Sequence, residues 1–154
     1  MLQGVVCFVE RASRITGVRG ISLIGSLTTQ KADPKDVDLM VAIGPETDLP
    51  ALAQAGRKLK GHTQQINKGA DIFLSQDGRY LGRTCSYREV FHRQICGKLR
   101  CLHERPHLCD TAGLFLLPDT LVSAPPIRLW PEFKAFTQAP LDVMETLGTR
   151  MTSF

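Results

Sequence analysis

G-I-S-L-I-G-S-L-T-T-Q-K-A-D-P-K-D-V-D-L-M-V-A-I, residues Gly20 to Ile43, contains two apolar runs separated by a polar loop. The first run is typical of a buried strand, and it ends at the small residues Gly25 and Ser26. The second run carries two carboxylates and then continues as five apolar residues to Ile43, which is typical of a strand in a covered sheet. The stretch therefore predicts two strands joined by a loop.

The two carboxylates of the second run are Asp36 and Asp38, with Val37 between them. Residues two apart on a strand point to the same face, so the two acidic side chains are expected to lie side by side. Like charges placed together at the start of a buried strand reduce stability unless a cation lies between them. The pattern therefore predicts a site for a divalent metal.

A Gly-Ser pair at the end of one strand and an Asp-x-Asp at the start of the next resemble the signature of the DNA polymerase beta-like nucleotidyltransferase superfamily. The likeness is closest to its small members, the minimal nucleotidyltransferases, and it covers roughly the first half of the chain. These proteins carry a third carboxylate on a neighbouring strand. Here the apolar run from Gly69 to Leu74 supplies one at Asp71.

The resemblance implies a role for each of these residues. Asp36 and Asp38 would hold a pair of magnesium ions, and Asp71 would hold the ion that activates the acceptor and serve as its base. Gly25 would let the backbone approach the phosphates of a nucleoside triphosphate, ATP among them, and Ser26 would bind the terminal phosphates through its amide and hydroxyl. Nucleotidyl transfer needs such positioning and charge compensation more than covalent chemistry.

The composition is that of one globular domain: 154 residues, of which 43% are hydrophobic. We expect residues 1–76 to form the nucleotidyltransferase core and residues 77–154 to extend the same domain. A net charge of +4 suits anionic substrates such as nucleotides or RNA. No apolar run is long enough for a membrane span or a signal peptide, so the sequence favours a cytoplasmic protein without a membrane partner.

Helical spacing predicts a helix over Leu2–Ile15 and another over Leu49–Lys60, the second leading to the strand that carries Asp71. The sequence therefore predicts an α/β (α+β) fold, with a mixed sheet flanked by helices. In such a sheet the strands bearing the three carboxylates should be neighbours. Cys7 lies near the apolar side of the first helix, where we expect it to be part of the core.

A basic, loop-rich segment, residues 79–109, holds four of the five cysteines and three of the four histidines. A zinc ion could hold such a segment together. The favoured ligands are Cys85, His92, Cys96 and Cys101, with His103 as the rival of His92 and Cys109 outside the site. No CxxC pair is present, so the alternative stays open that these are free thiols packed against the sheet.

The rest of the chain gives weaker patterns. Gly113 to Leu117 could form a final strand, residues 123–127 are extended by their prolines, and Trp130 is expected to act as an apolar anchor. Leu141–Met151 has helical spacing through Leu141, Met144 and Leu147, as expected of a frayed end or of a helix that binds a partner.

Two functions of different classes follow. The first is an active nucleotidyltransferase that modifies an RNA such as tRNA, a protein or a small molecule, within a toxin–antitoxin pair as some small relatives are. The second is an inactive or weakly active module of the same fold that holds RNA or a partner protein through its basic Cys/His-rich segment. The presence of Asp36, Asp38 and Asp71 favours the enzyme.

Overall fold

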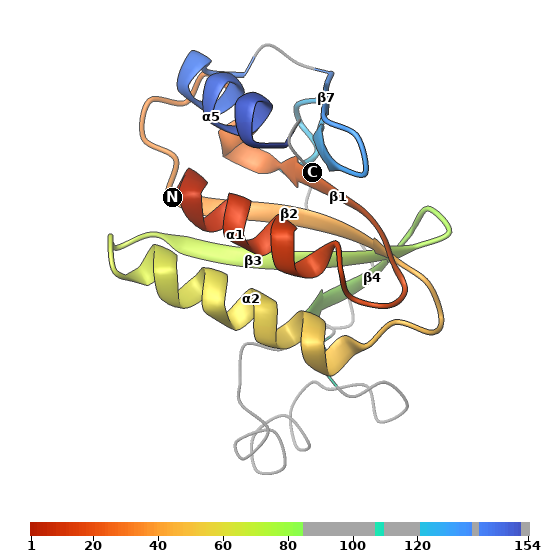
Figure 1. Cartoon of the computed structure of the whole chain (residues 1–154). Coiled ribbons are helices and arrows are strands. Elements are labelled where there is room, and N and C mark those ends of the chain that lie inside the picture. Colours follow the sequence, from red (N-terminus) through yellow and green to blue (C-terminus); the bar gives the residue numbers. More distant parts are fainter. Residues whose placement is uncertain (85–106, 110–120, 137–138, 152–154) are drawn as a thin grey trace.

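A computed structural model of the chain describes residues 1–84, 107–109, 121–136 and 139–151. The elements follow one another as α1 (Leu2–Ala12), β1 (Val18–Ile24), the 3₁₀ helix η1 (Gly25–Thr28), β2 (Asp36–Ile43), α2 (Leu49–Gln64), β3 (Gly69–Gln76), β4 (Arg79–Thr84), β5 (Leu108–Cys109), β6 (Ile127–Trp130), β7 (Lys134–Ala135) and α5 (Leu141–Met151) (Figure 1).

The seven strands of the described residues form one sheet in the order β5-β4-β3-β2-β1-β6-β7. Strands β2 and β3 run parallel, because α2 carries the chain back between them, and the other neighbouring pairs run antiparallel. The prediction of a mixed sheet with flanking helices is confirmed at this level. The strands that carry Asp36, Asp38 and Asp71 are neighbours at the centre of the sheet.

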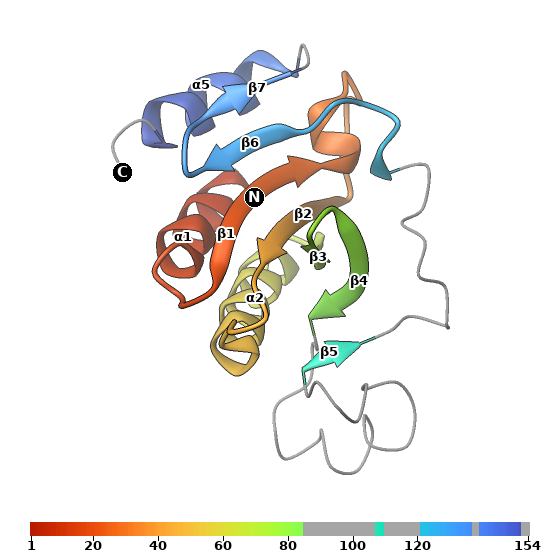
Figure 2. The ribbon, with the colours of Figure 1, turned by 90° about the vertical axis from the view of Figure 1, so that its right-hand side faces the viewer.

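The hydrophobic core lies on one face of the sheet. Alternate residues of the central strands point into it, including Val37 and Leu39 of β2 and Ile72 of β3, each at most 3% exposed. Helices α1 and α2 lie side by side on this face (Figure 2), and α5 contributes Val143 and Leu147 to the same core. The remaining residues of β2 and β3, the three carboxylates among them, belong to the opposite face, which is called the open face below.

The helices differ from prediction mainly at their ends. Helix α1 stops at Ala12 rather than Ile15, and α2 extends to Gln64 from an N-cap at Asp48, whose carboxylate accepts a hydrogen bond from the amide of Ala51 at 3.0 Å. The prediction that Cys7 is part of the core is wrong, because its side chain is exposed. The buried side of α1 is formed by neighbouring positions such as Phe8, and position 7 faces away from it.

The second half supplies strands that periodicity did not predict. Residues 127–130 form β6, which pairs with β1, and Trp130 packs against the core as expected of an apolar anchor. Helix α5 matches the predicted span, but Leu141 is 79% exposed while Val143 is buried. The strand expected at 113–117 lies outside the described residues. In the described part of the chain, no helix is long and apolar enough to cross a membrane.

Candidate active site

The pairing of β2 with β3 brings the three carboxylates together. Asp38 lies directly opposite Asp71, and Asp36 lies opposite Gly69, two residues nearer the start of both strands. Their neighbours Val37 and Ala70 point into the core, so the acidic side chains share the open face. The Asp-x-Asp strand and the strand of the third carboxylate thus start at the same end of the sheet.

Asp38 is the buried member of this group. Its residue is 8% exposed, whereas Asp36 is exposed and Asp71 is partly exposed. Burial, together with the negative charges of Asp71 and Asp36, raises the pKa of Asp38 from 3.8 to about 6. The ionised form of Asp38 is therefore destabilised by its surroundings, and a nearby cation would offset this cost.

Among the described residues, Arg83 of β4 is a cation that lies beside this group. Its Nη1 lies 3.0 Å from Oδ2 of Asp71, and its guanidinium stacks over the ring of Phe73, 5.8 Å from the centroid. Arg83 pairs with Phe73 across the two strands, which places it on the same face as Asp71. Its positive charge lowers the pKa of Asp38, in opposition to the carboxylates.

Replacing Arg83 with Met should raise the pKa of Asp38 above about 6, because the positive charge of Arg83 opposes the effect of burial and of the neighbouring carboxylates. Both partners of the Arg83–Asp71 pair are about one-third exposed, so we expect a loss of about 1 kcal/mol in unfolding free energy at neutral pH. A carbon-detected NMR titration of the Asp38 carboxyl group measures the pKa. The matched control is Arg79→Gln on the exposed start of β4; an unchanged Asp38 titration in Arg83→Met would contradict the assignment.

Two glycines allow the carboxylates to sit where they do. Gly25 has a φ of +73°, and a Cβ there would lie 2.5 Å from Oδ2 of Asp38. Gly69 faces Asp36, and a Cβ at that position would collide with Oδ1 of Asp36. The backbone at the end of β1 therefore packs directly against the buried carboxylate, with no side chain between them.

Ser26, the partner of Gly25 in the sequence pattern, lies in different surroundings. It lines a cavity of about 660 Å³, together with residues at the start of α1, the 29–34 loop, Lys68 and the start of α5. The cavity therefore opens on the side of the helices, whereas Asp38 lies on the open face. Gly25 therefore lies beside the Asp38 carboxylate, whereas Ser26 lines the cavity.

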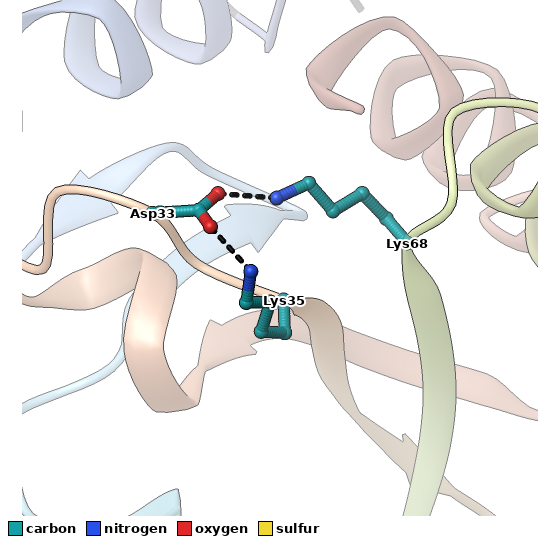
Figure 3. Close-up of polar contacts among 3 residues, drawn as sticks. All are labelled: Asp33, Lys35 and Lys68. Atoms are coloured by element: carbon teal, nitrogen blue, oxygen red, sulfur yellow. Dashed lines mark hydrogen bonds and ion pairs between the residues drawn. The ribbon is translucent and has the colours of Figure 1, made fainter.

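A charged cluster at the cavity holds the loop in place. The carboxylate of Asp33 contacts the ammonium groups of both Lys35 and Lys68 (Figure 3). Hydrogen bonds from the two lysines lower the pKa of Asp33 from 3.8 to about 2. The amide of Gly69 donates to the carbonyl of Lys35 at 2.9 Å. The contacts of Asp33 therefore tie the loop before Asp36 to the turn before β3.

The donor chemistry of the acidic group suits magnesium, which prefers carboxylate oxygens. Asp38 is buried beside two like charges, which a divalent cation would offset. The described side chains nevertheless contain no set of three or more His, Cys, Asp or Glu residues arranged to hold a metal ion. With Arg83 paired to Asp71, the carboxylates are neighbours without being a closed coordination shell.

The zinc ligands predicted at Cys85, His92, Cys96 and Cys101, with the rival His103, lie outside the described residues. Arg83 falls within the basic segment 79–109, and the sequence does not single it out there. Its pairing with Asp71 depends on the β3–β4 register. One signal could have indicated this pairing: Phe73 lies two residues after Asp71, and a hairpin of β3 with β4 puts Arg83 opposite Phe73.

Comparison with protein-family models gives no match to the chain, and comparisons with curated proteins and with solved structures give none either.

Proposed function

We propose that the chain is a metal-dependent nucleotidyltransferase, which transfers a nucleoside monophosphate from a nucleoside triphosphate to an RNA, a protein or a small molecule. One observation carries the proposal: Asp38 and Asp71 are register partners on neighbouring parallel strands, with Asp36 on the same face. Gly25 supports it, because its backbone lies close to Asp38 with no side chain between them, so that a phosphate bound at the carboxylates would meet backbone rather than a side chain there.

The chain's residues would divide the work as follows. Asp36 and Asp38 would hold magnesium, which would supply positive charge to offset the phosphates and to lower the pKa of the attacking hydroxyl. Asp71 would take up the proton of that hydroxyl as its oxygen bonds to the α-phosphorus of the triphosphate and pyrophosphate leaves. Arg83, paired with Asp71 at 3.0 Å, offers a planar guanidinium that can bind phosphate oxygens in a bidentate manner.

A thermal-shift titration tests the proposal. The wild type and the Asp36→Asn/Asp38→Asn variant are heated with each of the four ribonucleoside triphosphates, with and without magnesium. A ligand at about 100 times its dissociation constant adds about 2.7 kcal/mol to the folded state. We expect at least one triphosphate to raise the melting temperature of the wild type by roughly 5–10 °C, only with magnesium.

Each variant is compared with its own ligand-free melting temperature, because loss of the charges changes stability by itself. Asp77→Asn is the matched control, since this carboxylate is exposed in the turn before β4, and it should respond like the wild type. A wild type that responds to no triphosphate, or a double variant that responds fully, would overturn the proposal. In the first case binding of RNA or a partner protein without transfer becomes the leading function.

A further inference from the structure

Two cations surround one exposed aromatic ring at the edge of the sheet. Phe136 follows β7 and is 48% exposed. The ammonium of Lys134 lies 5.2 Å from its centroid, and the guanidinium of Arg128 lies 6.0 Å from it. We call Arg128, Lys134 and Phe136 the β6–β7 patch. An aromatic ring beside Arg and Lys is the combination that holds single-stranded nucleic acids, through base stacking and phosphate contacts.

The patch lies on the open face, with the carboxylates. Ile127 and Leu129 of β6 point into the core, so Arg128 between them points the other way, and Lys134 is its register partner on β7. Arg128 pairs with Ser22 of β1, and Ser22 pairs with Met40 of β2, two residues beyond Asp38. With strands about 4.8 Å apart and a rise of about 3.3 Å per residue, this register puts the Cα atoms of Arg128 and Asp38 about 12 Å apart.

Arg128 retains unused hydrogen-bonding capacity. Within the part of the chain that the structure describes, its Nε is buried and has no hydrogen-bond partner. Its ion pair with Glu132 spans 3.8 Å, and the Glu132 side chain is 81% exposed, so a competing anion can displace it at little cost. A phosphate oxygen would take the place of Glu132 on the terminal guanidinium nitrogens, because the Arg128 side chain is 39% exposed even though its Nε is buried.

We propose that the β6–β7 patch binds single-stranded nucleic acid, with one base stacked on Phe136 and the neighbouring phosphates on Arg128 and Lys134. The role of that strand as the acceptor rests on the proposed function. The binding surface itself does not. A strand held at the patch runs across β1 toward Asp38 on the same face, so its end is presented to the carboxylates.

Fluorescence anisotropy with a short fluorescein-labelled single-stranded RNA tests this. Phe136→Leu should weaken binding roughly tenfold, because a base loses its stacking partner. Arg128→Gln and Lys134→Gln should each weaken binding several-fold and reduce the slope of log affinity against log salt by about 0.7. Lys58→Gln is the control, because this exposed lysine lies on α2, on the other side of the sheet, and it should bind like the wild type.

The outcomes separate this inference from the proposed function. A wild type that does not bind the RNA, or patch variants that bind it as the wild type does, overturns the inference whatever the triphosphate titration gives. So does an acidic peptide that competes equally and depends equally on Phe136, since the surface would then serve a protein. Asp36→Asn/Asp38→Asn should bind the RNA at least as tightly as the wild type, because it removes negative charge from the face that the strand crosses; RNA binding without any triphosphate response would support the patch and remove the proposed transfer.

Discussion

Replacing Asp38 with Asn should stabilise the protein by about 3 kcal/mol at pH 8, in buffer that contains EDTA. The unfolded chain ionises this carboxyl near 3.8, whereas the folded protein does so at about 6. Between these values the folded state retains a proton that the unfolded state has lost, so wild-type stability falls as the pH rises from about 4 to about 6. The difference of roughly two pKa units corresponds to about 3 kcal/mol at higher pH.

Urea unfolding of the wild type and Asp38→Asn at pH 4 and pH 8 measures the effect. The free energies of unfolding of the two proteins should be nearly equal at the lower pH and differ at the higher one. Thermal unfolding at pH 8 should give the variant a melting temperature roughly 6–12 °C higher. Asp77→Asn serves as the control, because this carboxylate is 75% exposed and the change should be within about 0.5 kcal/mol. A variant that is less stable than the wild type at pH 8 would contradict the prediction that the ionised Asp38 side chain destabilises the folded protein.

A carboxylate that destabilises its own fold at neutral pH is unusual for a purely structural residue. The spacing of Asp36 and Asp38 predicts the like-charge pair by itself, and the alternation of β2 places both on the open face. The burial of Asp38, and hence the size of its pKa shift, depends on contacts from two other strands. These contacts are nonlocal, so the Asp-x-Asp pattern could not predict which of the two carboxylates would be buried.

The central elements were predictable because each has a strong local period. The strand from Asp36 to Ile43 was predicted with its observed limits, and α2 and β3 differ only at their ends. Strand β6 was missed because it has only four residues and follows two prolines, so little periodicity remains in it. Its pairing with β1 is what places Arg128 on the open face. The candidate nucleic-acid surface therefore became visible only with the sheet order.

The cavity beside Ser26 shows the same limit. From the sequence, Gly25 and Ser26 form one motif, and the resemblance gives them one ligand. In the structure the chain turns at Gly25 into η1, so that Gly25 contacts Asp38 whereas Ser26 lines the cavity near Lys68. Adjacent residues on a tight turn point in different directions, and a motif does not specify which residue faces the carboxylates.

Replacing Gly25 with Ala should destabilise the protein by about 3 kcal/mol. Its φ of +73° costs a residue with a Cβ about 1–2 kcal/mol, because the left-handed region crowds the Cβ against the backbone. The new methyl group would also lie 2.5 Å from Oδ2 of Asp38, which is buried and has little room to move. Thermal and urea unfolding at pH 8 measure the total.

A double-mutant cycle with Asp38→Ala separates the two causes. Without the carboxylate, Gly25→Ala should cost only the backbone part, about 1–2 kcal/mol, so the two changes should be strongly non-additive. Gly61→Ala is the control within α2: nothing lies within 4 Å of its Cβ, and helix propensity predicts a gain of about 0.5–1 kcal/mol. An equal cost of Gly25→Ala in both backgrounds would show that the turn needs glycine for its backbone conformation alone. The contact between the new methyl group and the Asp38 carboxylate would then contribute nothing to the cost.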